Sequence, residues 1–326
     1  MKKFVSILLV LVLMMSLSVA AFASEVDTPA EASPAPTTAT LAKVVTVTND
    51  GTKMPAQTFS FVVGKVSVTD AAADVTEANM PVPTVDSVTY AEGESGSKTL
   101  AINLPEYTSV GVYTYTITEN AGSTAGMVYD TASRTLKVTV VNGTTEGTFA
   151  VAGTVLVGTD NKKSDSFNNV YNAGSLEITK TVTGNLGDKS KDFTFTVTLN
   201  APEGKTVKSM ITVGGSEPVA FESGHTYTFT LKHGESYSFG NLPYGVTYTV
   251  TETAADGYTT TVNRTAGNTI TSEISAAAQT VAFVNDKNDG NLDLGVSMDS
   301  LPYILMLVVV GAAVVVIATR KKGEQF

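Results

Sequence analysis

The chain has 326 residues, with 21 Lys and Arg against 31 Asp and Glu, a net charge of −10 and no cysteine. This acidic balance argues against nucleic acid as a partner. Without cysteine the chain cannot form disulfides, thiolate metal sites or thiol nucleophiles, so any covalent reinforcement must use other chemistry. No cofactor and no metal ion are expected.

The N-terminus reads as an export signal. Two lysines precede an apolar run over residues 4–19, and Ala21 and Ala23 follow it with small–x–small spacing. This pattern is typical of a secretory signal peptide, residues 1–23, with cleavage after Ala23. The alternative is an uncleaved N-terminal anchor. Residues 24–40, rich in Pro, Ala and Thr, are expected to form a linker.

The body of the chain has the pattern of an all-β protein. Thr, Val, Tyr and Phe alternate with a period of two, and Gly, Asn, Asp and Pro punctuate the strands. The segment 111–119 in the first half resembles 245–252 in the second. The length exceeds that of one usual sandwich, so we expect two tandem β-sandwich domains, at 41–172 and 173–288.

The C-terminus reads as a membrane anchor. Residues 289–300 are predicted to be a linker, and residues 301–319 are uncharged and long enough to cross a bilayer. Residues 320–326 begin with three basic residues, which tend to stay in the cytoplasm. We therefore expect a transmembrane helix at 301–319, a cytoplasmic tail, and a body that lies outside the cell.

Polar residues fall on the apolar faces of several predicted strands. Six share this feature, in the order Lys, Glu, Asn in each half: Lys43, Glu119 and Asn169, then Lys180, Glu252 and Asn285. A buried Lys or Glu is costly unless it is neutralised or paired. An ordinary buried Lys–Glu pair is the alternative in each half, and it leaves the asparagine unexplained.

Lysine, glutamate and asparagine together permit a reaction. Burial lowers the pKa of a lysine and raises that of a carboxyl, so a buried pair can exist as neutral amine and neutral acid. A neutral amine is a nucleophile, and the carboxamide carbon of asparagine is an electrophile. The glutamate can polarise the amide and relay protons while ammonia leaves. The product is an amide that joins the first strand of a domain to its last.

The chain resembles a Gram-positive, streptococcal-type major (backbone) pilin. The segments that carry the resemblance are 54–61, 111–119, 127–130 and 167–171 in the first half, and 176–180, 188–195, 241–246 and 281–285 in the second. The resemblance implies two immunoglobulin-like (CnaB-like) sandwiches, each closed by a Lys–Asn isopeptide bond. The bonds would join Lys43 to Asn169 and Lys180 to Asn285, with a glutamate assisting each.

The resemblance also implies that a sortase joins subunits head to tail. The acceptor lysine would be Lys162, seven residues before the bond-forming asparagine, with Lys163 as its neighbour. The alternative is an ordinary pair of loop lysines. The expected sorting motif is degenerate, because Asp293 and Leu294 stand where proline and threonine are expected, and only Gly295 matches well.

Other chemistry finds little support. The acidic segment 286–293 fails as a calcium loop, because Lys287 falls at a ligand position. His225 and His233 have no partner in a recognisable triad.

The leading hypothesis is therefore a self-cross-linked pilin or stalk at the cell surface. Its expected partners are other pilin subunits, a sortase and the membrane. A membrane-anchored adhesin is the second hypothesis, and a secreted hydrolase has no site in this sequence. The cross-linking would be a single self-modification, so no enzymatic turnover is expected.

Overall fold

The computed structural model describes residues 36–288, and every regular element in that range is a β-strand. This confirms the all-β prediction. Between residues 36 and 288 no helix is long and apolar enough to cross a bilayer. The predicted signal peptide at 1–23, the sorting motif at 293–295 and the membrane span at 301–319 all lie outside the described residues.

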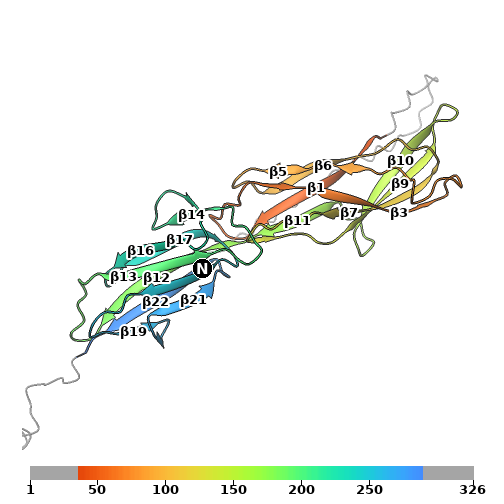
Figure 1. The fold of residues 1–326 in the computed structure, drawn as a ribbon. Helices are drawn as coiled ribbons and strands as arrows, with labels where there is room; N and C mark the ends of the chain where they lie inside the picture. The colour runs from red at the N-terminus through yellow and green to blue at the C-terminus, as the bar shows by residue number, and fades with distance from the viewer. Residues whose placement is uncertain (1–35, 289–326) are drawn as a thin grey trace, which may run out of the picture. The chain divides into compact units, whose positions relative to one another are not determined.

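The first half of the described chain forms two main sheets, which we call the first sandwich (Figure 1). One sheet has the strand order β4-β6-β1-β11-β8, the other has the order β10-β9-β7-β3, and β2 pairs with β5. The strands are β1 (Thr38–Val47), β2 (Gln57–Phe59), β3 (Phe61–Thr69), β4 (Thr84–Val85), β5 (Val88–Tyr90), β6 (Gly96–Asn103), β7 (Gly111–Glu119), β8 (Met127–Val128), β9 (Arg134–Asn142), β10 (Phe149–Val157) and β11 (Ser166–Tyr171).

The second half repeats this plan, and we call it the second sandwich. One sheet has the order β15-β14-β17-β12-β22-β19-β20, and the other has the order β16-β13-β18-β21. The strands are β12 (Ala173–Thr183), β13 (Phe193–Asn200), β14 (Met210–Val213), β15 (Val219–Ala220), β16 (Thr226–Leu231), β17 (Ser236–Pro243), β18 (Thr247–Glu252), β19 (Thr259–Val262), β20 (Thr265–Ala266), β21 (Thr269–Glu273) and β22 (Ala278–Asp286).

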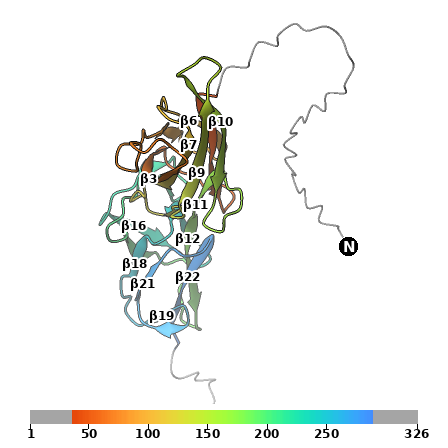
Figure 2. The same cartoon turned by 90° about the vertical axis from the view of Figure 1, so that its right-hand side faces the viewer.

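The first and last strands of each sandwich are parallel neighbours. β1 pairs with β11, and β12 pairs with β22, so segments far apart in the sequence lie side by side (Figures 1 and 2). The register is the same in both: the lysine lies opposite a phenylalanine that precedes the asparagine by two residues, as the pairs Lys43–Phe167 and Lys180–Phe283 show. Each lysine and asparagine therefore come from adjacent strands of one sheet.

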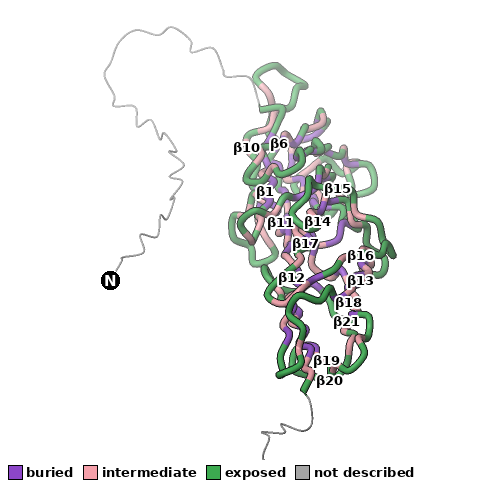
Figure 3. The backbone as a smooth tube through the Cα atoms, turned by 90° about the vertical axis from the view of Figure 1, so that its left-hand side faces the viewer, coloured by how far each residue is buried: buried purple, intermediate pink, exposed green. Residues whose placement is uncertain are grey.

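Each sandwich has its own apolar core. Strict alternation along the strands puts one face inside, as in β7, where Tyr113, Tyr115 and Ile117 are fully buried. The buried positions follow the strands, and the loops are largely exposed (Figure 3). The opposite face of β7 carries threonines, which suit a half-buried pleated surface.

The start of β1 differs from the expected linker boundary. Residues 38–40, predicted as the end of the linker, belong to β1. Ala39 lies opposite Ile102 of β6 and is buried, so the pairing with β6 extends the strand beyond its apolar run. Sequence composition gave no sign of this, because the Ala- and Thr-rich stretch contributes mainly backbone hydrogen bonds.

Candidate functional site

The first sandwich brings Lys43, Glu119 and Asn169 together in its interior. Lys43 comes from β1 and Asn169 from β11, while Glu119 ends β7 in the other main sheet. The Lys43 Nζ donates to Glu119 Oε2 at 2.7 Å, and Asn169 Nδ2 donates to Glu119 Oε1 at 2.5 Å. The Lys43 and Glu119 side chains are 0% exposed. One carboxylate thus holds both the amine and the carboxamide.

The second sandwich holds Lys180, Glu252 and Asn285 in the same way. The Lys180 Nζ lies 2.9 Å from Glu252 Oε2 and 3.1 Å from Oε1, and Asn285 Nδ2 donates to Oε1. All three residues are buried. The structure therefore places all six predicted residues inside and groups them as two triads, each with the glutamate on the sheet opposite the lysine and asparagine.

Burial acts on both lysines in the same direction. Loss of solvent lowers the pKa of Lys43 and of Lys180 below 10.5, and this effect outweighs the hydrogen bond and charge of the partnering glutamate. Aromatic rings cover each amine, with the Nζ of Lys43 4.7 Å from the ring centre of Phe59 and that of Lys180 4.2 Å from Phe193. A depressed pKa favours the neutral amine, which is the form that can act as a nucleophile.

The first site also has a polar group that sequence reasoning missed. Chain direction after β8 brings Asp130 beside β11, and its main-chain N–H donates to Asn169 Oδ1 at 2.8 Å. The Asp130 carboxylate forms an ion pair with Arg134 at 2.7 Å, and both side chains are largely buried. The spacing of four residues between Asp and Arg was the available signal, but it is too common on its own to mark a site.

The second site lacks this partner. Asn285 Oδ1 is buried and has no hydrogen-bond partner within residues 36–288. The carboxamide oxygen thus accepts a hydrogen bond in the first sandwich and has no partner in the described part of the second. The carboxamide nitrogen donates to a glutamate in both.

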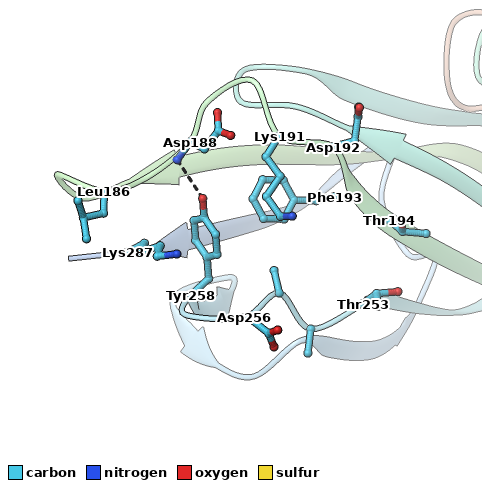
Figure 4. A pocket seen from close by; sticks show the side chains of 12 residues that line it. Leu186, Asp188, Lys191, Asp192, Phe193, Thr194, Thr253, Asp256, Tyr258 and Lys287 are labelled. Atoms are coloured by element: carbon cyan, nitrogen blue, oxygen red, sulfur yellow. Dashed lines mark hydrogen bonds between the residues drawn. The ribbon is translucent and has the colours of Figure 1, made fainter. Parts of the chain in front are cut away.

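An open pocket of about 470 Å³ lies next to the second site (Figure 4). Phe193, whose ring covers the amine of Lys180, lines it together with Tyr258, which accepts a hydrogen bond from the Asp188 N–H at 2.9 Å. Its charged lining residues are of both signs: Asp188, Lys191, Asp192, Asp256 and Lys287. Phe193 therefore separates the buried amine from an open surface depression.

The two histidines lie outside this pocket and have structural contacts. His233 Nδ1 accepts a hydrogen bond from the Val182 N–H at 3.0 Å, and His225 lies 3.5 Å from the Glu222 carboxylate. His233 therefore helps to fix β12 at Val182, two residues after Lys180, whereas His225 lies at the surface.

The candidate acceptor lysine lies on an exposed turn. Lys162 follows β10, and the Gly158 N–H donates to its carbonyl oxygen at 2.8 Å. Its side chain is 84% exposed, and its Nζ lies 3.6 Å from the Asp160 carboxylate. Lys163 beside it is less exposed, at 60%. Lys162 is thus accessible to an external reagent and belongs to neither buried triad.

Known proteins share both halves of this architecture. Residues 39–172 match the family described as the Spy0128-like isopeptide containing domain, and residues 174–287 match a domain of unknown function, DUF7601. The pilin of Streptococcus pyogenes serotype M1 is 35% identical over 260 residues, which are 72% of this chain and 76% of that protein. The crystal structure of the major pilin from Streptococcus pyogenes is 30% identical and covers 79% of this chain and 100% of its own, with a TM-score of 0.54.

A shorter similarity involves a second kind of pilus protein. The pilus tip adhesin Cpa of Streptococcus pyogenes is 36% identical over 115 residues, which are 35% of this chain and 17% of the adhesin.

Each of the two sandwiches has a lysine and an asparagine held by one buried carboxylate, and the first matches the isopeptide containing domain; these features define a structural protein built from domains of this type. The sequence identity to the Streptococcus pyogenes pilin, and the share of both chains that it covers, identify the family. The chain belongs to the pilin family and is a structural subunit of a pilus. This confirms the resemblance in the sequence. The comparisons also indicate other pilus subunits as its partners.

Proposed function

We propose that each sandwich closes itself with an isopeptide bond, Lys43 to Asn169 in the first and Lys180 to Asn285 in the second. The observation that carries this proposal is the shared carboxylate: Glu119 binds both the amine and the carboxamide nitrogen, and Glu252 does the same. An ordinary buried ion pair would account for the lysine and the glutamate. It would not explain why an asparagine completes the group twice in the same register.

The reaction balances without a cofactor. The carboxylate takes a proton from the lysine ammonium, and the neutral Nζ attacks the asparagine Cγ. A proton from the attacking nitrogen passes through the glutamate to Nδ2, the Cγ–Nδ2 bond breaks, and ammonia leaves. The new amide nitrogen keeps one proton. The glutamate still holds the proton that it took from the ammonium, and it becomes a carboxylate again when the departing ammonia accepts that proton and leaves as ammonium. Burial excludes water and holds the reactants in contact, which favours aminolysis over hydrolysis.

The bonds would suit a fibre under tension. In immunoglobulin-like (CnaB-like) domains of the proposed extents 41–172 and 173–288, each bond would join the first strand to the last. A force that enters along one of these strands would pass through the cross-link to the other, and the strands between would bear little of it. The cross-link would also restrict the unfolded chain, as other cross-links do.

The same proposal includes assembly at the cell surface. Lys162 is the proposed acceptor for a sortase, supported by its exposure and by its place on a turn outside the buried sites. The signal peptide, the degenerate motif at 293–295 and the membrane span at 301–319 complete the scheme as sequence predictions. Detergent-resistant ladders from cells, lost with Lys162→Ala and retained with Lys163→Ala, are the expected result.

A membrane-anchored adhesin is the second candidate function. The similarity to part of a pilus tip adhesin supports it. Only monomer in the ladder experiment, from cells that display the protein, would favour the adhesin over the polymer.

The intact mass of the purified ectodomain tests the cross-links. We expect a mass lower than the sequence mass by two ammonia molecules, with one restored in Glu119→Ala and one in Glu252→Ala. The full sequence mass in the unsubstituted protein would contradict the proposal and would leave two buried Lys–Glu pairs.

A further inference from the structure

The carbonyl oxygen of Asn169 has a hydrogen-bond donor of its own, apart from the Lys–Glu–Asn triad. The Asp130 main-chain N–H donates to Oδ1 at 2.8 Å, while Nδ2 of the same carboxamide donates to Glu119. Both ends of the carboxamide are thus fixed. The oxygen cannot exchange places with the nitrogen without losing two hydrogen bonds, so the leaving nitrogen always faces the proton-transfer group.

The Asp130 N–H is held in place by the carboxylate of its own residue. Oδ1 of Asp130 accepts from the Ala132 N–H at 2.9 Å, and Oδ2 accepts from the Asn168 N–H at 3.0 Å and from Arg134 Nη2 at 2.7 Å. The Asn168 contact ties the loop to β11, next to the reacting residue. Three hydrogen bonds therefore fix the direction of one main-chain donor.

Arg134 is anchored in turn. Its Nε and Nη2 both donate to the carbonyl oxygen of Ser166, at 3.0 and 2.7 Å, and its guanidinium lies 4.5 Å from the ring centre of Phe167. Arg134 is 6% exposed. Burial alone would raise the pKa of Asp130, but the hydrogen bonds from Asn168 and Ala132 and the charge of Arg134 outweigh it and hold that pKa below 3.8. The carboxylate is thus charged at neutral pH.

Attack of an amine on a carboxamide places negative charge on the carbonyl oxygen. A donor that already points at this oxygen stabilises the tetrahedral intermediate without a free-energy cost for reorientation. The Asp130 N–H already lies 2.8 Å from Oδ1 in the unreacted carboxamide, which is a normal hydrogen-bond distance, and it points at the oxygen on which the charge develops. In the second sandwich the equivalent oxygen, Asn285 Oδ1, is buried without a hydrogen-bond partner among the described residues.

We propose that the Asp130 main-chain amide is the oxyanion donor of the first site, and that the Asp130 carboxylate and Arg134 are positioning residues that aim it. This rests on the proposed cross-linking. The donor forms and breaks no covalent bond: charge gathers on Oδ1 when Nζ attacks Cγ, and returns to the carbonyl when ammonia leaves.

The test is a time course of bond formation in the full chain. The chain is made by pulsed cell-free synthesis in detergent, quenched in denaturant at intervals, and digested so that the peptides joined at each site are measured separately. Asp130→Ala leaves the main-chain N–H but removes its three supports. We expect the first bond to form about tenfold more slowly, with the second bond unchanged, since removal of a complete oxyanion donor costs about 100-fold or more.

The matched control is Asp165→Ala, which removes an exposed aspartate between β10 and β11 that pairs only weakly with Lys163, at 3.7 Å. Its first bond should form at the unsubstituted rate. Asp130→Asn keeps one side-chain oxygen that can accept from the loop amides and should recover part of the lost rate. A merely structural role would not show this rescue. Protease resistance of the same variants in a Glu119→Ala background, where no first bond forms, separates folding from chemistry.

Each result is decisive. Equal rates for Asp130→Ala and Asp165→Ala, with both bonds forming, would overturn the oxyanion assignment and leave the cross-linking intact. Absence of both bonds in the unsubstituted chain would overturn the cross-linking itself. If Asp130→Ala does not fold, the comparison of Asp130→Asn with Asp165→Asn decides in its place: a slower first bond in Asp130→Asn alone supports the proposal, and equal rates overturn it.

Discussion

The two sandwiches hold the same triad but surround it differently. In both, the lysine and asparagine lie on parallel neighbouring strands, and the glutamate reaches them from the other sheet. In the first, a buried Asp–Arg pair directs a main-chain donor at the carboxamide oxygen. In the second, that oxygen has no partner in the described structure, and an open pocket lies behind the ring that covers the amine.

This difference separates two requirements of the reaction. Contact between amine, acid and amide occurs at both sites. It results from the strand register, which places the lysine and the asparagine side by side in the same way in both sandwiches. Stabilisation of the carbonyl oxygen is local, because it depends on a loop that only the first site has. A site with the first feature alone can still react, and we expect it to react more slowly.

The largest predicted effect is on stability. Asn169→Ala and Asn285→Ala each prevent one bond, and they open loops of about 130 and about 110 residues, for which the chain-entropy model gives about 4 to 5 kcal/mol each. Because the two loops are of similar length, we expect similar losses in the free energy of unfolding of the two sandwiches, measured by guanidinium denaturation.

Asn168→Ala is the control for this measurement, because Asn168 is exposed and precedes the reacting asparagine on β11. Its unfolding should stay close to that of the unsubstituted protein. A loss in only one of the two variants would mean that only one sandwich is cross-linked.

The second prediction concerns pH and the lysines without their bonds. Burial holds the pKa of Lys43 and Lys180 below 10.5, so between that lowered pKa and 10.5 the unfolded chain binds more protons than the folded one. In Glu119→Ala and Glu252→Ala, stability should therefore rise with pH through this window, by at most about 1.4 kcal/mol per pH unit. Removal of the glutamate widens the window, because its contacts raise the lysine pKa.

The matched control replaces the amine as well. In Glu119→Ala combined with Lys43→Met, the increase of stability with pH that is due to the lysine should disappear. Any increase that is still measured comes from other titrating groups. In the cross-linked protein the nitrogen is an amide and does not titrate in this range. A stability that is flat or falls with pH in the single variants would contradict burial as the dominant effect on these amines.

The triad residues could be predicted because the alternation of buried and exposed positions along a strand is visible in the amino-acid sequence. A lysine among Leu and Val at every second position can be recognised without a structure, and the repeat of the order Lys, Glu, Asn made the pattern specific. Asp130 could not be found in this way, because its contribution comes from a main-chain N–H, which every residue except proline carries. The direction of that N–H depends on tertiary contacts of the carboxylate with Asn168 and Arg134.

The limits of β1 and the pocket beside Phe193 were also beyond sequence reasoning. β1 extends to Thr38 because β6 offers a partner strand, and the pocket arises where loops meet. Neither depends on a local pattern. The predictions for residues 1–35 and 289–326 lie outside the described structure and stay predictions.

The third prediction is the order of the two reactions in the unsubstituted chain. A complete oxyanion donor contributes about 100-fold or more to such a rate, and the second site has none among the described residues, so the first bond should form about 100-fold faster than the second. Peptide mapping of a synthesis time course measures both rates in one sample. Equal rates, or a faster second bond, would show that the bare carbonyl of Asn285 is not the limiting feature.

The smallest predicted effect comes from the aromatic covers. Both rings are almost fully buried. The Phe193 ring lies 4.2 Å from Lys180 Nζ, packs edge-on against Tyr258 and lines the open pocket, whereas Phe59 packs against Tyr90 and Tyr129 and does not line that pocket. Leucine at either position removes the cation–π contact, worth about 0.5 to 2 kcal/mol to the ammonium. At Phe193 the smaller side chain also lets water approach from the pocket.

Hydration stabilises an ammonium more than a ring face does, so water entry should keep Lys180 protonated and slow its attack. We therefore expect Phe193→Leu to slow the second bond by a few-fold, and Phe59→Leu to leave the rate of the first bond nearly unchanged or slightly faster, since only the cation–π contact is lost there. Peptide mapping at both sites checks this, with each sandwich serving as the internal control for the other. Equal slowing by the two substitutions would mean that the pocket gives water no access to the amine, and that the two sites differ only at the carbonyl oxygen.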